Sequence, residues 1–175
     1  MRRFLFWAPL ALTALLLVLL AVGLMRPAER TTPSRLAGQA MPDFRLPPAV
    51  PGVPGLTSAD LGRGRPRLVN VFASWCVPCT AEMPQLHALR RAGVEVVGIA
   101  IRDAPGPLAE FFARNGNPFA RIGADTESRV QIALGSSGVP ESFLVDGRGV
   151  ILAQHIGVIQ PDQVAGIAAR LKAAR

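Results

Sequence analysis

The sequence predicts an α/β domain in which helices cover a mixed β-sheet. Two near-continuous apolar runs, at 67–72 and 94–101, are typical of central strands that are buried on both faces. A helical pattern lies between them. Farther along, Asp-Gly-Arg-Gly at 146–149 separates two apolar segments and indicates an antiparallel hairpin.

Each further element follows from its own local pattern. Proline is favoured in the first turn of a helix and glycine after the last, which predicts one helix from Pro107 to Gly116 and another that begins at Pro161. The other expected elements are a strand at 43–46, a helix at 79–92 between the central strands, a helix at 126–134, and hairpin strands at 142–145 and 150–155.

Length and composition suit one domain with an appendage, because the chain has 175 residues and 50% of them are hydrophobic. The net charge is +7, but no basic run carries interleaved aromatic residues. Arg63, Arg65 and Arg67 are interrupted by Gly64 and Pro66, as in a solvated turn. We therefore expect no nucleic-acid partner.

The appendage is an apolar N-terminal segment, 4–25, which contains no charged residue. As a helix it would span roughly 33 Å, about one hydrocarbon thickness. Arg2 and Arg3 precede it, so the positive-inside rule places the N-terminus in the cytoplasm. The alternative is a cleaved signal peptide, but its apolar region is shorter, about 7 to 15 residues. Both interpretations export the rest of the chain.

These features divide the chain into four parts. We expect a cytoplasmic N-terminus at 1–3, a single-pass transmembrane anchor at 4–25, a polar linker at 26–39 and a globular domain at 40–175.

The chain contains two cysteines, Cys76 and Cys79, placed directly after a buried strand and before a helix. Two intervening residues allow a disulfide across one turn at a helix start, so the pair can cycle between dithiol and disulfide. We assign Cys76 as the nucleophile, because a thiolate at a helix N-terminus faces unpaired N–H groups and the positive end of the helix dipole. Cys79, inside the helix, is the resolving cysteine. The alternatives are a structural disulfide or half of a metal site.

Four segments of the sequence form a recognisable set. They are Leu-Val-Asn-Val-Phe-Ala-Ser-Trp-Cys at 68–76, Ala81-Glu82, Gly-Asn-Pro-Phe at 116–119 and Gly-Val-Pro-Glu-Ser-Phe-Leu-Val-Asp-Gly at 138–147. Together they resemble the thioredoxin fold and, more narrowly, the membrane-anchored cytochrome c biogenesis thioredoxins of the DsbE or CcmG type. The resemblance covers about residues 35–172.

The resemblance implies roles for residues around the cysteines. Pro140 would be a cis-proline facing them, leaving the backbone of Val139 to pair with an extended substrate, and Trp75 would help shape the docking surface. Thioredoxins usually carry a buried aspartate six residues before the first cysteine, where this chain has Asn70. Proton transfer would therefore fall to one of two acids, Glu82 or Glu141.

The expected function is that of a thiol-disulfide oxidoreductase without a cofactor, anchored in the bacterial inner membrane with its catalytic domain in the periplasm. The resemblance implies a reductant in cytochrome c maturation, supplied by a membrane electron donor. Its client would be apocytochrome c, whose haem-site cysteines must be reduced, or a maturation protein.

Three other functions remain open. One is a general periplasmic dithiol-disulfide oxidoreductase, and another is a docking module whose cysteines are dispensable. The third is a metallochaperone, for which His87 or His155 would have to join the cysteines. Neither histidine lies at a recognised metal-ligand spacing, so we expect both to be packed or surface residues.

Overall fold

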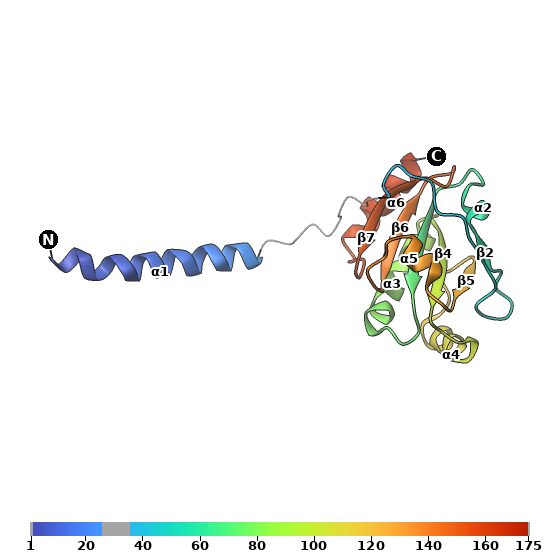
Figure 1. Ribbon diagram of the computed structural model, residues 1–175, viewed down its shortest axis with the longest axis horizontal. Helices are drawn as coiled ribbons and strands as arrows, with labels where there is room; N and C mark the ends of the chain where they lie inside the picture. Colours follow the sequence, from blue (N-terminus) through green and yellow to red (C-terminus); the bar gives the residue numbers. More distant parts are fainter. Residues whose placement is uncertain (1, 26–35, 175) are drawn as a thin grey trace.

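The domain is built on a five-stranded sheet, as the computed structural model shows (Figure 1). The structure describes residues 2–25 and 36–174. The strands lie in the order β5-β4-β3-β6-β7. Their bounds are Arg67–Phe72 for β3, Glu95–Ile101 for β4, Ile122–Asp125 for β5, Glu141–Val145 for β6 and Ile151–Ile156 for β7.

The pairing confirms the expected mixed sheet. Strand β3 at the centre pairs in parallel with β4 and antiparallel with β6, while the two outer strands pair with those neighbours. Every residue of β3 is buried, as its continuous apolar run predicts. The register places Asn70 opposite Ser142, so their side chains share one face of the sheet.

The helices agree with the predicted ones, apart from their ends. They are α3 (Val77–Arg91), α4 (Pro105–Asn115), α5 (Arg129–Ala133) and α6 (Gln163–Ala173). Helix α3 begins before Cys79, because Cys76 caps it and Pro78 fits its first turn. Helix α4 likewise begins two residues before Pro107. Helix α5 is shorter than expected, and α6 packs beside α3.

The strand β1 (Arg45–Leu46) confirms the one expected at 43–46, although it is shorter. Other short elements were not predicted, namely β2 (Leu56–Thr57), α2 (Ser58–Leu61) and the edge strand β5. Strands of two residues show no periodicity, although α2 carries a readable signal in the capping box between Thr57 and Asp60. Strand β5 contains Gly123, and a Cβ there would lie 2.6 Å from the Leu46 Cβ. Gly123 weakens the strand pattern of β5 in the sequence, and the same glycine is required for the β1–β2 hairpin to approach β5.

Aromatic packing fixes α4 against the sheet. The rings of Phe72 and Phe119 stack with their centroids 4.6 Å apart, and Phe111 and Phe112 of α4 lie around them. Gly98 on β4 makes room for this pair, because a Cβ there would lie 2.8 Å from a Phe72 ring carbon. The C-terminal end of β3, from which the cysteine segment continues, is therefore held rigidly.

The N-terminal segment forms helix α1 (Arg2–Met25). Its described large apolar side chains, among them Trp7 and Leu10, are exposed. Within the described part of the chain, no helix meets the combined length and hydropathy needed to cross a membrane. Most of the expected linker, 26–35, lies outside the described residues. The domain's ladder begins near Gly38, whose N–H donates to the Ile151 carbonyl across 2.8 Å.

Candidate active site

The two cysteines form a disulfide at the N-terminus of α3. Cys76 is the cap residue, and its Sγ accepts the backbone N–H of Cys79 at 3.1 Å. Both sulfur-bearing residues are nearly covered, with 5% of Cys76 and 2% of Cys79 exposed. Their neighbours Trp75 and Val77 are 55% and 80% exposed, so two exposed apolar side chains lie next to Cys76 in the chain.

This geometry favours a thiolate on Cys76 when the bond is reduced. The sulfur lies where the helix presents unpaired N–H groups. Pro78 has no N–H, and the Cys79 N–H in the same first turn donates to the sulfur. The helix dipole acts in the same direction. Cys79 lies inside the helix, and among the described residues no hydrogen bond to its sulfur matches the one that Cys76 Sγ accepts, so the two sulfurs differ in their electrostatic surroundings although both are buried.

Asp103 holds the segment before the cysteines. Its carboxylate accepts the Ser74 N–H at 2.5 Å and the Ser74 hydroxyl at 2.8 Å. The Trp75 ring N–H donates to the Arg102 carbonyl at 3.2 Å. Sequence reasoning missed Asp103, although a signal existed: Ser74 and Asp103 each follow a parallel strand, and the carboxyl ends of neighbouring parallel strands meet at one edge.

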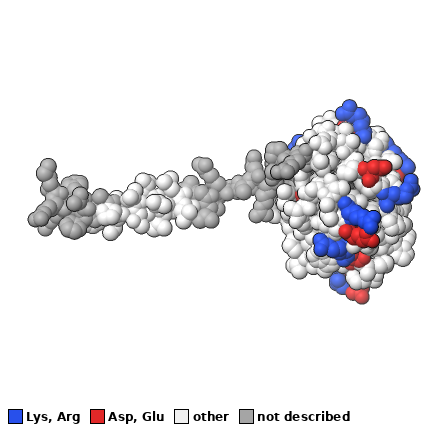
Figure 2. Space-filling view, in the orientation of Figure 1, with Lys and Arg blue, Asp and Glu red and all other residues white. Residues whose placement is uncertain are grey.

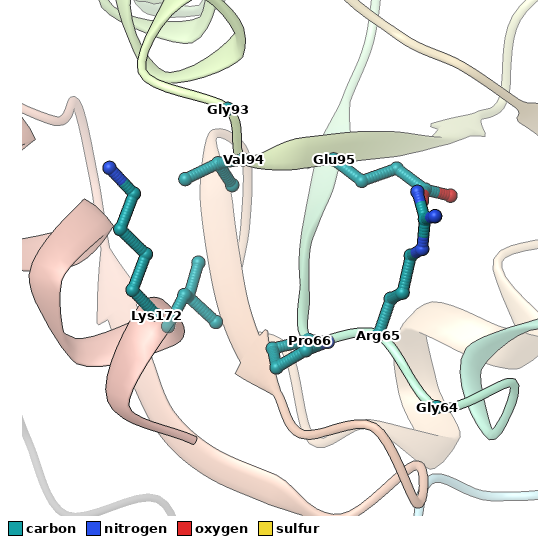
Figure 3. A pocket seen from close by; sticks show the side chains of 8 residues that line it. Gly64, Arg65, Pro66, Gly93, Val94, Glu95 and Lys172 are labelled. Carbon is teal, nitrogen blue, oxygen red and sulfur yellow. The ribbon is translucent and has the colours of Figure 1, made fainter. Parts of the chain in front are cut away.

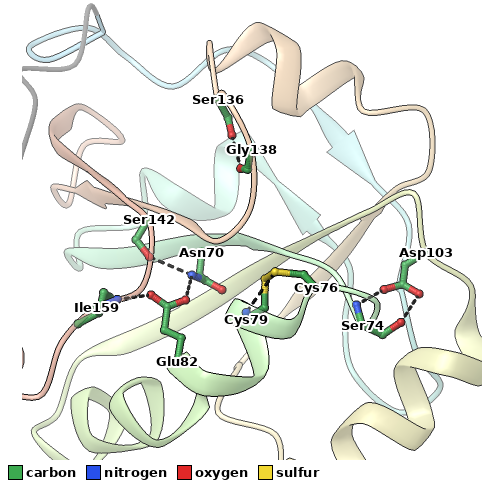
Figure 4. The surroundings of a disulfide bond; sticks show 10 residues. All are labelled: Asn70, Ser74, Cys76, Cys79, Glu82, Asp103, Ser136, Gly138, Ser142 and Ile159. Carbon is green, nitrogen blue, oxygen red and sulfur yellow. Dashed lines mark hydrogen bonds between the residues drawn. A yellow bond between two sulfur atoms is a disulfide. The ribbon is translucent and has the colours of Figure 1, made fainter. Parts of the chain in front are cut away.

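A buried polar network lies beneath the disulfide, where Glu82 of α3 meets the central strand (Figure 4). The Asn70 amide donates to Glu82 Oε2 at 3.0 Å and to the Ser142 hydroxyl at 2.9 Å. Glu82 Oε1 accepts the Ile159 N–H at 2.9 Å. All three polar side chains are fully buried, and burial raises the pKa of Glu82 to about 7, against the opposing effect of these hydrogen bonds.

Of the two candidate acids, Glu82 belongs to the buried network with Asn70, whereas Glu141 binds the loop at 136–137. The Glu141 carboxylate accepts hydrogen bonds from the Ser136 hydroxyl at 2.6 Å, the Ser137 N–H at 3.0 Å and the Gln154 amide. It therefore fixes the loop that precedes the Val139–Pro140 peptide bond. That bond is cis, as the resemblance implied.

The histidines pack within the fold. His87 Nε2 lies 2.9 Å from the Asn115 carbonyl and so joins α3 to the end of α4. His155 is buried on β7. In the described ranges, no three histidine, cysteine or acidic side chains lie close enough together to hold a metal ion.

The surface hollow in Figure 3 lies away from the cysteines. It has a volume of about 370 Å³, and Arg65, Glu95 and Lys172 are among the residues that line it. Arg65 precedes the first residue of β3, whereas Cys76 follows the last. Because the strand separates the two, we assign this hollow no part in the chemistry.

Comparison with known proteins identifies the chemistry of the site. A family model described as Redoxin matches residues 36–171. The chain is 42% identical over 160 residues to the thiol:disulfide interchange protein DsbE of Pseudomonas fluorescens, covering 91% of this chain and 88% of the relative. It is 41% identical over 132 residues to the thiol:disulfide interchange protein HelX of Rhodobacter capsulatus, covering 75% and 74% of the two chains.

A solved structure supports the same assignment. A putative thiol:disulfide interchange protein DsbE from Chlorobium tepidum superimposes with a TM-score of 0.66 at 28% identity, covering 79% of this chain and 96% of the other. The fold is therefore thioredoxin-like, with the Cys76–Cys79 disulfide at the start of a helix as its redox centre. The chain belongs to the Redoxin family, as a thiol-disulfide oxidoreductase of the DsbE type.

Proposed function

We propose that this oxidoreductase works as a periplasmic reductant in cytochrome c maturation, and that it keeps either the haem-site cysteines of apocytochrome c or a maturation partner reduced. One observation carries the proposal: a single disulfide at a helix start, with Cys76 Sγ accepting an N–H, on a chain similar to DsbE proteins over most of its length. An oxidising compartment would supply no electrons for this task, so a membrane dithiol carrier has to reduce the Cys76–Cys79 disulfide.

The proposed cycle moves two electrons from the enzyme to the client. The Cys76 thiolate attacks one sulfur of the client disulfide, forms a mixed disulfide and releases the first client thiolate. Cys79 then loses its proton and attacks Cys76 Sγ, which restores the Cys76–Cys79 bond and releases the second client thiolate. The Cys79 proton ends on a client sulfur, and the membrane carrier returns two electrons to the enzyme.

Glu82 is the group that we assign to this proton transfer. It lies one helical turn after Cys79 on α3, and its pKa of about 7 lets the carboxylate accept a proton and release it near neutral pH. Asn70 cannot exchange a proton in this way, because an amide is neutral throughout this range. Glu141 stays a candidate by sequence, but its hydrogen bonds hold the loop at 136–137.

Client docking is proposed for the surface around the disulfide. Trp75 is exposed beside Cys76, and Val139 is half-buried in the segment that ends in Pro140. An extended client strand could pair with the Val139 backbone while an apolar side chain contacts the Trp75 ring. Such docking would bring the client sulfur to Cys76 in a fixed orientation.

A trapping experiment tests both the client and the direction of the cycle. In cells that produce the full-length Cys79→Ser variant, Cys76 can form a mixed disulfide that no second cysteine resolves. We expect apocytochrome c or a maturation protein to be captured, to be released by dithiothreitol and to be identified by mass spectrometry.

The matched control is the Cys76→Ser variant, which keeps Cys79 and should capture nothing. Capture of unrelated exported proteins alone would replace the cytochrome assignment with that of a general periplasmic oxidoreductase. Equal capture by both variants would contradict the assignment of Cys76 as the nucleophile.

The membrane anchor is also part of the proposal. The segment 4–25 carries no charge and lies within the 24-residue helix α1, whose described side chains are uncharged and exposed (Figure 2). A helix that is apolar on all sides, with no partner helix in the described chain, suits a bilayer. Arg2 and Arg3 would leave the N-terminus in the cytoplasm, and the linker and the domain that follow the anchor would then lie in the periplasm.

Membrane fractionation of the full chain tests the anchor. We expect the protein to stay in the membrane pellet after alkaline carbonate extraction, with an intact mass that includes residues 1–25. A soluble protein that lacks this segment would instead show that it is a cleaved signal peptide. A chain in which a cleavable leader replaces 1–25 provides the soluble control.

A further inference from the structure

The Asn70 side chain has one polar atom without a partner. Both amide hydrogens are committed, one to Glu82 Oε2 and one to the Ser142 hydroxyl. The carbonyl oxygen, Oδ1, is buried and accepts no hydrogen bond from any described residue; in the described chain only Asn70 Oδ1 and His155 Nε2 are buried side-chain polar atoms of this kind. A buried carbonyl without a donor destabilises the folded state, so a role for this oxygen is expected.

The orientation of the amide is determined by its neighbours. Oxygen atoms of Glu82 and Ser142 lie on the side of the nitrogen, and the reverse orientation would place the Asn70 oxygen against an oxygen of the ionised Glu82 carboxylate. The remaining direction is toward the cysteines, and Figure 4 shows Oδ1 pointing to the side of the disulfide, where Cys79 lies. Cys79 and Glu82 are also three residues apart on α3, which places them on the same face.

We propose that Asn70 Oδ1 accepts the S–H of Cys79 once the Cys76–Cys79 disulfide is reduced. In the disulfide, the Cys79 sulfur has no hydrogen to donate. Reduction adds two electrons and two protons to the pair: one proton is lost from Cys76 as its thiolate forms, and the other stays on Cys79 Sγ. The Asn70 oxygen then gains its donor in one redox state alone.

This inference deepens the proposed function and rests on its redox cycle. A hydrogen-bond acceptor at Cys79 favours its thiol over its thiolate. Cys76 therefore remains the nucleophile, and Cys79 stays protonated until the mixed disulfide has formed. The same amide donates to Glu82, the proposed proton acceptor. Asn70 therefore contacts both ends of the proton transfer without exchanging a proton itself.

Infrared spectroscopy of the S–H stretch tests the contact directly. In the full-length Cys76→Ser variant, Cys79 is the one remaining thiol, so the band belongs to it alone. We expect the band at a lower wavenumber with Asn70 present than after a further Asn70→Leu change, because an accepted hydrogen bond weakens the S–H bond. Bands at the same wavenumber would overturn the inference, and they would do so without any client or electron donor.

Three variants separate the contact from general damage to the core. Ser142→Ala removes the other partner of the amide and should leave the band in place. If Asn70→Leu does not fold, two other variants replace it. Asn70→Asp keeps an oxygen at this position and should keep the low band. Asn70→Ser has a shorter side chain whose oxygen does not reach Cys79, so it should lose the low band. A low band in Asn70→Ser would likewise overturn the inference.

The disulfide–dithiol equilibrium gives a second measurement, with both cysteines present. Loss of a hydrogen bond of about 1 kcal/mol in the reduced state alone should shift the equilibrium of Asn70→Leu toward the disulfide about fivefold, or about 20 mV. The bonds of Asn70 to Glu82 and Ser142 exist in the oxidised state as well, so their loss largely cancels. A shift toward the dithiol would contradict the proposed contact.

Discussion

The Asn70 amide donates to Glu82 Oε2 across 3.0 Å and so links the central strand to the helix that carries both cysteines. The acceptor is the fully buried carboxylate of Glu82, and the donor is the neutral amide of Asn70. Because the amide supplies hydrogen bonds but no compensating charge, burial outweighs them and the pKa of Glu82 rises.

The raised pKa of Glu82 predicts a loss of stability as the pH increases. The folded state holds this proton up to about pH 7, whereas the group in the unfolded chain titrates near its ordinary pKa of 4.5. The stabilisation is thus complete below pH 4.5 and lost as the pH rises to about 7, by on the order of 3 kcal/mol. Urea unfolding of the oxidised protein between pH 4.5 and 8 measures this, with Glu82→Gln expected to show a flatter dependence. The exposed Glu110→Gln serves as the control, and equal slopes in all three proteins would contradict the buried ionisation.

Removing the Asp103 carboxylate should loosen the segment before Cys76. Asp103→Ala leaves the Ser74 N–H and hydroxyl without their acceptor, which should lower the free energy of unfolding by about 1–2 kcal/mol. Cys76 alkylation near pH 6.5 should slow severalfold, because the cap that favours its thiolate is less well fixed. Asp103→Asn keeps an oxygen acceptor and should recover part of both losses. Glu110→Ala, on the exposed side of α4, is the matched control, and an Asp103→Ala protein that reacts like it would refute the role.

The exposed Trp75 ring should matter for client binding more than for folding. With 55% of the residue exposed, Trp75→Ala should change the free energy of unfolding by less than about 1 kcal/mol. It should raise the KM for an oxidised Cys-X-X-Cys-His peptide about fivefold to tenfold, with a smaller change in kcat. Trp75→Phe keeps a ring but loses the N–H bond to the Arg102 carbonyl, so it separates the two contributions. A KM that is unchanged in both variants would place the docking surface elsewhere.

Two glycines should respond to alanine in opposite ways. A Cβ at Gly98 would lie 2.8 Å from a Phe72 ring carbon and 3.2 Å from Phe119, so Gly98→Ala should cost about 1–3 kcal/mol. A Cβ at Gly166, within α6, meets nothing within 4 Å, and Gly166→Ala should stabilise the protein by about 0.5–1 kcal/mol. Urea unfolding compares the two variants. A neutral Gly98→Ala would mean that the Phe72–Phe119 pair moves freely.

The sheet was predictable where a pattern is long or marked by turn residues. The runs at 67–72 and 94–101 carry enough buried residues to identify central strands, and 146–149 marks its hairpin. The two-residue strand β2 was not predictable, because its pairing with β1, and not a local periodicity, makes it a strand. The edge strand β5 was not predictable either, because Gly123, which allows Leu46 to lie close to the strand, weakens its local strand pattern.

The sequence by itself determined the redox pair, the helix that follows it and the family, because these depend on spacing along the chain and on local motifs. It also marked Glu82 and Glu141 as equivalent candidates, because a sequence does not show which groups surround a carboxylate. Only the tertiary structure separated them, by burying Glu82 against Asn70 and turning Glu141 toward Ser136. The direction of a side chain depends on residues from other parts of the chain, and these residues bring Glu82 into the buried network and make Glu141 hold a loop.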